Sequence, residues 1–201
     1  MTALTAFLND IRPTLPAATV MAVTRAARRT LRGFCKETKA YEFEFDDADY
    51  TLAADNLVAT FTLPTDTEIY SPLVVKISDA PIRFSGTKDQ AINRQGRQSC
   101  KVVFPDGLEF ATEVGGEITG TLVLIPTYNA NEVADDIVGR HYEVLLEGIL
   151  ANLYLMEGSA WFNTDLAQLH ANLYAAGVEK AADEVAGRHA YHDSTTQYGG
   201  L

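Results

Sequence analysis

The stretch Ala-Ala-Arg-Arg-Thr-Leu-Arg-Gly-Phe-Cys-Lys-Glu-Thr, residues 26–38, decides how the chain begins to fold. Around it, apolar residues recur at steps of three and four positions: Val20, Val23, Ala27, Leu31 and Phe34. This spacing places apolar side chains on one side of an α-helix. The sequence therefore predicts a helix of about 20 residues, with Pro16 suited to its first position.

Basic residues occupy the opposite side of this predicted helix: Arg25, Arg28, Arg29, Arg32 and Lys36. Three interpretations stay open: a solvated face with local pairing, a contact onto an acidic surface of a neighbouring subunit or partner, and nucleic-acid binding. The acidic balance of the whole chain opposes the third. Arginine rather than lysine slightly favours docking, because a guanidinium is weakly hydrated and can clamp a carboxylate with two hydrogen bonds.

The hydrophobic period changes to two at Tyr41, where Tyr41, Phe43 and Phe45 alternate with glutamates. This alternation is typical of a strand with one wet face. Pro105-Asp106-Gly107 predicts a hairpin turn. Further strands are predicted at Leu57–Leu63, Ile69–Ser78, Lys101–Phe104, Leu108–Glu113 and Ile118–Ile125. The middle of the chain should form a small antiparallel sheet, sandwich or barrel.

Two long helices are predicted after residue 130. Asn131 can cap the first, which carries a wide apolar stripe up to Tyr154 and should be the central core helix. Gly158 suits the left-handed position after a helix end, and Asn163 can cap the second. We expect the apolar face of the second helix to include Leu166, Leu169, Leu173, Val178 and Val185, with Gly187 as its end.

Together with a short helix predicted over Ala3–Ile11, these segments predict an α+β fold. It would be a helical bundle of about four helices contributed by both chain ends, residues 1–40 and 131–187. An antiparallel β domain would be inserted at 41–130, and an extended C-terminal tail would occupy residues 188–201. The tail is too polar and glycine-rich to pack alone.

Ser85–Ser99 is a nearly apolar-free loop of unusual length within the predicted β domain. It carries Lys88, Arg94 and Arg97 against Asp89, so it is a basic finger on an acidic protein. Two interpretations stay open: a mobile hairpin tip, or a contact loop for a neighbouring subunit or partner.

The 201 residues carry a formal net charge of −11, which is unevenly distributed. Residues 1–40 hold seven basic against two acidic side chains, a net charge of +5, whereas residues 131–188 hold three against ten, a net charge of −7. The two predicted helical parts are therefore electrostatically complementary, within one subunit or between copies. Cys35 and Cys100 fit no paired-cysteine pattern, and we expect buried free thiols and synthesis in a reducing cytosol. Neither a signal peptide nor a membrane span is expected.

No phosphate-binding loop, nucleophile elbow or zinc-protease motif occurs in the chain. His189 and His192 lack the carboxylates or thiols of a zinc site, and the aspartates at 46, 47 and 49 lack the rest of a calcium loop. We therefore expect no enzymatic activity, catalytic residue, cofactor or metal. Trp161 and Phe162 are expected to cover a helix corner as local core, with an interface anchor as the alternative.

Residues 26–38 and the stretch Leu150-Ala151-Asn152-Leu153-Tyr154-Leu155-Met156-Glu157-Gly158-Ser159-Ala160-Trp161-Phe162-Asn163 resemble the head-to-tail adaptor, or connector, proteins of tailed bacteriophages. The order of elements is similar over most of residues 15–186, and these two blocks carry the likeness in residue detail. The middle of about 90 residues, from Tyr41 to Ala130, is larger than the resemblance leads us to expect.

The resemblance implies a structural virion protein, made in the host cytoplasm. It would form a ring, commonly of twelve copies, between the portal and a downstream stopper or tail protein. Double-stranded DNA would pass through the lumen without specific binding, and no membrane would be involved. The tail could order on the portal with Tyr191, Tyr198 and Leu201 as anchors. The alternatives are a tail-completion or tail-tube-associated virion protein, a cytosolic ligand-binding or regulatory protein, or an enzyme with an unrecognised site.

Overall fold

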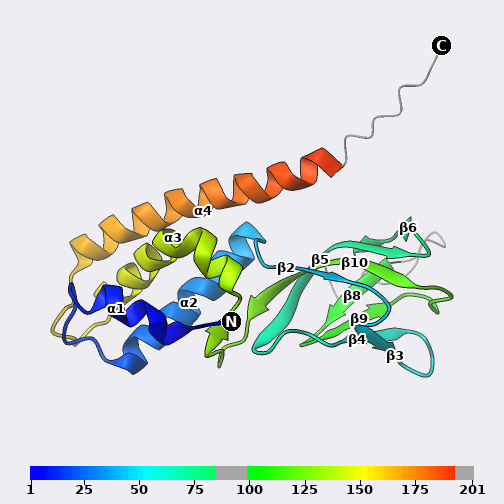
Figure 1. Ribbon diagram of the computed structural model, residues 1–201, viewed down its shortest axis with the longest axis horizontal. Coiled ribbons are helices and arrows are strands. Elements are labelled where there is room, and N and C mark those ends of the chain that lie inside the picture. The colour runs from blue at the N-terminus through cyan, green and yellow to red at the C-terminus, as the bar shows by residue number, and fades with distance from the viewer. Residues whose placement is uncertain (85–98, 193–201) are drawn as a thin grey trace, which may run out of the picture. The chain divides into compact units, whose positions relative to one another are not determined.

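The chain forms two compact units in the computed structural model, which describes residues 1–84 and 99–192 (Figure 1). The helical unit combines Met1–Ala40 with the chain from Asn131 onward, and the β unit is Tyr41–Ala130. Of residues 189–192 only the backbone is described. Each unit has its own buried core, with Phe34 and Ile137 among the buried residues of the first and Ile69 and Leu122 among those of the second.

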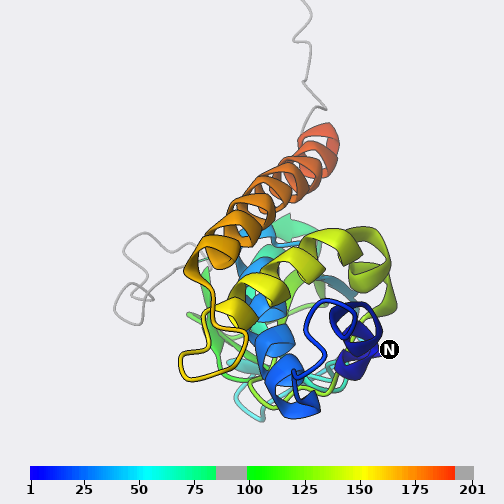
Figure 2. The same ribbon diagram turned by 90° about the vertical axis from the view of Figure 1, so that its left-hand side faces the viewer.

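The helical unit contains a short sheet as well as helices. Its elements are β1 (Thr2–Ala3), the 3-10 helix η1 (Leu4–Phe7), α1 (Leu8–Ile11), α2 (Val20–Thr38), β11 (Glu132–Val133), α3 (Asp135–Tyr154) and α4 (Thr164–His192). β1 and β11 pair antiparallel. α3 packs against both α2 and α4, and Figure 2 shows α4 running alongside α3. The single helix predicted over Ala3–Ile11 is therefore divided among β1, η1 and α1.

Pro16 does not take the first position of α2, because Thr19 sets its start. The Thr19 hydroxyl accepts a hydrogen bond from the amide of Ala22, which satisfies one of the free N–H groups of the first turn. Lys39 ends the helix in the left-handed conformation, with φ of 56°. The predicted apolar face is buried at Val23, Ala27, Leu31 and Phe34 and supplies much of the core of this unit.

α3 starts without a side-chain cap, so the predicted role of Asn131 is wrong. Ala134 stands at the cap position, and the Asn131 side chain instead accepts a hydrogen bond from Arg28. The backbone leaves helical geometry once, at His141, whose ring tilts against Phe34 with 4.8 Å between centroids. α3 therefore bends at the residue where it meets the core side of α2.

α4 begins at the predicted cap and continues beyond the predicted end. The side-chain oxygen of Asn163 accepts hydrogen bonds from the amides of Asp165 and Leu166. Gly187 does not end the helix, which reaches His192, so the residues from 188 to 192 are helical and not an extended tail. Gly158 has a positive φ of 79° but lies in the connection between the helices, beyond the last residue of α3.

The strands described in the β unit form two sheets. The strands are β2 (Glu42–Phe45), β3 (Tyr50–Leu52), β4 (Val58–Phe61), β5 (Thr67–Ile77), β6 (Ala80–Pro81), β7 (Arg83–Phe84), β8 (Ser99–Val103), β9 (Gly107–Phe110) and β10 (Ile118–Pro126). One sheet has the order β2-β10-β5-β6 and the other β3-β4-β9-β8-β7. All pairs are antiparallel except β7 with β8. The predicted hairpin at 105–107 joins β8 to β9.

The predicted fold class, a chain-end helical bundle with one inserted antiparallel domain, is wrong. Within the described residues the chain is α+β with four α-helices and three sheets, and one sheet lies in the helical unit itself. α1 is a single turn, so the chain ends do not supply four comparable helices. The β1–β11 and β7–β8 pairs arise from contacts between strands of only two to five residues, which leave no periodic pattern in the sequence.

Candidate interaction surfaces of the helical unit

The arginines predicted as contact residues gather on the side of α2 that faces away from its core. We call Arg25, Arg28, Arg29 and Arg32 the basic face. Arg25 and Arg29 are exposed, while Arg28 and Arg32 are half-buried. The Nη2 group of Arg28 donates to the side-chain oxygen of Asn131 over 2.8 Å. Arg28 is therefore committed to its own helical unit, and Arg25 and Arg29 are the members of the basic face best placed to meet another molecule.

One apolar side chain at the start of α2, Met21, extends this face and is 80% exposed. Val20 lies on the predicted apolar side of the helix instead, but it is 47% exposed, so the prediction of a buried stripe fails at its first position. Met21, Arg25 and Arg29 follow one another at steps of four residues, so they form one row along the helix. Met21 was missed by the sequence analysis, because a single apolar residue outside the predicted buried stripe carries no periodic signal.

Three leucines of the predicted apolar face of α4 are exposed. Leu166 is 36%, Leu169 52% and Leu173 50% exposed, and we call these three residues the leucine stripe. The buried side of α4 carries smaller residues: Ala167, Val178, Ala181 and Val185. The predicted apolar face of α4 is therefore buried at Val178 and Val185 but exposed at the three leucines.

The reason for this reversal is the close approach of α3 and α4. A Cβ atom added at Gly177 would lie 2.5 Å from Cγ2 of Val144, and one added at Gly148 would lie 2.6 Å from Cδ2 of Tyr174. Helices this close leave room for glycine and alanine at their contact but not for leucine. The leucines are displaced to the shoulder of α4.

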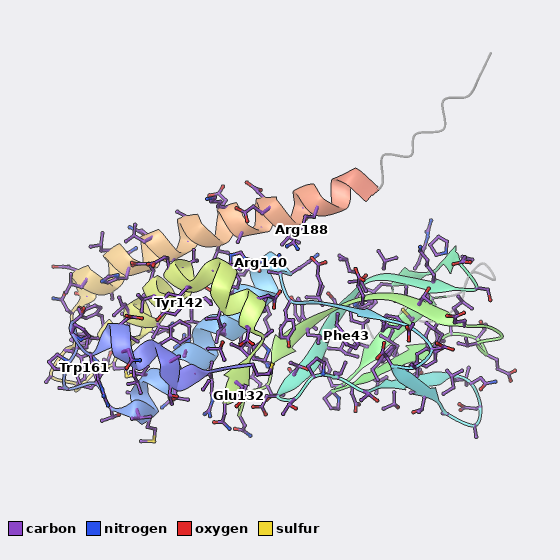
Figure 3. The ribbon with its side chains drawn as sticks, in the orientation of Figure 1. Phe43, Glu132, Arg140, Tyr142, Trp161 and Arg188 are labelled. Atoms are coloured by element: carbon purple, nitrogen blue, oxygen red, sulfur yellow. The ribbon has the colours of Figure 1, made fainter. Side chains whose placement is uncertain are left out.

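The corner between α3 and α4 is fastened by Trp161 (Figure 3). Its indole N–H donates to the carbonyl oxygen of Leu153 over 3.1 Å, and the amide of Asn163 donates to the carbonyl of Tyr154. Trp161 is half-buried, whereas Phe162 is 45% exposed. Trp161 thus positions the start of α4, and Phe162 adds to the apolar surface near the corner.

The remaining predicted contact residues cannot be placed. Lys88, Arg94 and Arg97 in the basic finger, and Tyr198 and Leu201 in the tail, lie outside the described residues. The backbone of Tyr191 belongs to α4, but its side chain is likewise outside what the structure describes. The structure therefore brings together the members of the basic face on α2 and places Trp161 and Phe162 at a different corner of the helical unit.

Polar groups inside the helical unit join α3 to its neighbours. His170 Nδ1 lies 2.5 Å from the Glu147 carboxylate, and the His170 ring stacks on Tyr154. The Tyr142 hydroxyl donates to Asp10, and burial raises the pKa of Tyr142 to about 12 (Figure 3).

Burial also raises the pKa of the Cys35 and Cys100 thiols to about 12, which makes both free cysteines unreactive. Neither cysteine, Cys35 in α2 or Cys100 in β8 of the β unit, is therefore an activated nucleophile.

The described part of the chain contains no group of three or more histidine, cysteine or acidic side chains arranged to hold a metal ion. No helix among the described residues combines the length and apolar character needed to span a bilayer. Two exposed surfaces within the described part of the helical unit, the row Met21–Arg25–Arg29 and the leucine stripe, are the candidate site of this protein. No protein-family model and no curated protein matches the chain.

Proposed function

We propose that this chain is a structural virion protein, a ring-forming adaptor between the portal and the tail of a tailed bacteriophage. The resemblance of residues 26–38 and 150–163 to such adaptors motivates the proposal. The observation that carries it is the pair of uncovered surfaces on the helical unit, one apolar and basic on α2 and one apolar on α4. A chain whose work is assembly needs two such surfaces, because one copy must offer to the next what it receives from the previous one.

The charge of the chain suits a DNA conduit. Twelve copies, each with a formal charge of −11, would carry −132 in total. An acidic wall repels the phosphate backbone, so DNA can move through the lumen without being held. Arg25 and Arg29 of the basic face would be taken up by contacts between copies and would not line the lumen.

Labelling of intact particles tests the proposal. Virions carrying this chain would be treated with gold-conjugated antibodies raised against the full-length protein and viewed by electron microscopy, before and after the tails are detached. We expect label at the head-to-tail junction, and retention of the protein on heads that keep their portal. Label along the tail tube would favour the tail-associated alternative, and absence of the protein from particles would refute a virion role.

A further inference from the structure

We infer that the leucine stripe of one copy is covered by the row Met21–Arg25–Arg29 of a second copy, with α2 and α4 running antiparallel. This inference rests on the proposed ring and names the surfaces that hold its subunits together. It assigns a partner to two faces that the helical unit itself does not cover.

The first step is that the leucine stripe lies beside the contact of α4 with its own subunit, where its side chains are 36–52% exposed. Around α4, the next positions after Leu173 are Gly177 and His170, which meet Val144 and Glu147 of α3. Tyr174 follows on the far side of these, where its hydroxyl donates to the carbonyl of Thr30 in α2. α3 therefore lies between the leucine stripe and α2 of the same copy, and the stripe looks away from the packed helices.

The second step is that α2 offers a matching row. Met21 is the most exposed of the large apolar side chains in the described residues. Arg25 and Arg29 continue the row, and each has an aliphatic stem that can lie on apolar surface while its guanidinium reaches a carboxylate. The row is therefore apolar at one end and cationic at the other.

The third step is the register. Met21 and Arg29 are eight residues apart, as are Leu173 and the exposed Asp165 at the start of α4. Eight residues of helix span about 12 Å. Antiparallel packing with Met21 on Leu173 thus puts the stem of Arg25 on Leu169 and the guanidinium of Arg29 beside the carboxylate of Asp165. It also aligns the two helix dipoles in opposite directions.

A parallel arrangement of α2 and α4 would not pair Arg29 with an acidic residue. The residues eight positions after the three leucines are Tyr174, Gly177 and Ala181. None of these is acidic, and all three point toward the helices of their own copy. Arg29 would have no carboxylate opposite it, so the charge pattern selects the antiparallel orientation.

The contact joins different surfaces of the two copies. α3 separates the leucine stripe from α2, so after a pair has formed one copy keeps an unused leucine stripe and the other keeps an unused row Met21–Arg25–Arg29. Repetition of such a head-to-tail contact adds copies until the rotation between them closes a ring. A two-fold dimer would instead bury the same patch on both copies.

Cysteine cross-linking of the full-length chain tests the inference. The variant Met21→Cys with Leu173→Cys should give a ladder of disulfide-linked oligomers on a non-reducing gel, since each copy carries both halves of the contact. A mixture of the two single variants should stop at the dimer. Cys35 and Cys100 are buried and do not compete. The matched control is Met21→Cys with Gln168→Cys, because Gln168 is exposed on α4 about 140° around the helix from Leu173.

A charge exchange provides the second arm. Arg29→Asp and Asp165→Arg should each weaken self-association by tenfold or more in sedimentation velocity, and the double exchange should restore it. An absent ladder, a ladder as strong with the Gln168 control, or a double exchange that fails to restore assembly would overturn the inference. Wild-type rings of defined mass combined with these negative results would leave the proposed function standing, whereas absence from the head-to-tail junction would remove that function whatever the ladder shows.

Discussion

α2 and α4 both carry large apolar residues at helical spacing, but α2 buries most of them and α4 exposes its leucines. α2 buries large apolar residues, including Leu31 and Phe34, and exposes arginines. α4 buries alanine and valine and exposes the leucine stripe. The difference lies in the neighbouring helix, because α3 approaches α4 so closely at Gly148 and Gly177 that neither position has room for a side chain. An apolar stripe therefore identifies the buried face of a helix only where the neighbour leaves room for it.

The largest expected effect compares one leucine from each helix. Leu31→Ala should lower the free energy of unfolding by about 2–5 kcal/mol, because Leu31 is fully buried and its truncation leaves a cavity. Leu169→Ala removes the same atoms from a half-exposed site and should change the free energy of unfolding by no more than about 0.5 kcal/mol. Urea unfolding followed by circular dichroism measures both.

The comparison extends to assembly. Leu169→Ala should weaken self-association in sedimentation velocity although it leaves the fold intact, because it removes part of the surface that a second copy covers. If Leu169→Ala destabilised the isolated chain as much as Leu31→Ala, the leucine stripe would belong to the core after all and the contrast between the two helices would be lost.

Much of the β unit was predictable because its signals are local. The alternation at 41–45 predicted β2, and the longer predicted strands overlap β4, β5, β8, β9 and β10. β3, β6 and β7 were not predicted, since two or three residues cannot show a period and their pairing depends on strands elsewhere in the chain. The fold class failed for the same reason: sheet membership is a property of pairs and not of single segments.

The candidate site was likewise predictable only where its signals are local. The clustering of Arg25, Arg28 and Arg29 on one face follows from spacing within a single helix and could be predicted. The bond of Arg28 to Asn131, 103 residues away, could not. The exposed leucines were also missed, although Ala167, Gly177 and Ala181 were a usable signal: small residues at helical spacing indicate a close helix contact and leave large ones for the outside.

The second prediction tests the close contact directly with two glycines of α4. Alanine at Gly177 would place its Cβ within 3.1 Å of three carbon atoms of Val144. Overpacking of about 1–3 kcal/mol should exceed the gain of about 1 kcal/mol in helix propensity, so Gly177→Ala should be destabilising. Gly187 has no neighbour within 4 Å, and Gly187→Ala should stabilise by up to about 1 kcal/mol. Thermal unfolding measures both variants. A lower melting temperature for Gly177→Ala together with a higher one for Gly187→Ala would support the close contact, and an equal rise in both would contradict it.

The third prediction compares the helix caps. Asn163 accepts two backbone N–H groups at 3.0 Å, whereas Thr19 accepts one at 3.2 Å. Asn163→Ala should cost about 1–2 kcal/mol and Thr19→Ala about 0.5–1 kcal/mol. Native-state hydrogen exchange would show the loss as faster exchange in the first turn of the affected helix. A larger loss for Thr19→Ala than for Asn163→Ala would mean that α2 depends on its cap more than α4 does, although α2 buries the larger apolar side chains.

The smallest expected effect concerns the α2 side of the core, where His141 of α3 lies against Phe34. Burial lowers the pKa of His141; Arg140 and Arg188 lower it further, and Glu184 and Asp136 oppose them. The folded chain therefore keeps this ring neutral at pH values at which the unfolded chain, with an ordinary pKa of about 6.5, binds a proton. The free energy of unfolding should fall as the pH drops below about 6.5, and this fall should be smaller in His141→Gln, which cannot be protonated. Urea unfolding of both proteins at about pH 7.5 and about pH 5.5 measures the difference. An equal fall in the variant would show that other groups cause the acid sensitivity. Burial of His141 against Phe34 would then not lower the free energy of unfolding in acid.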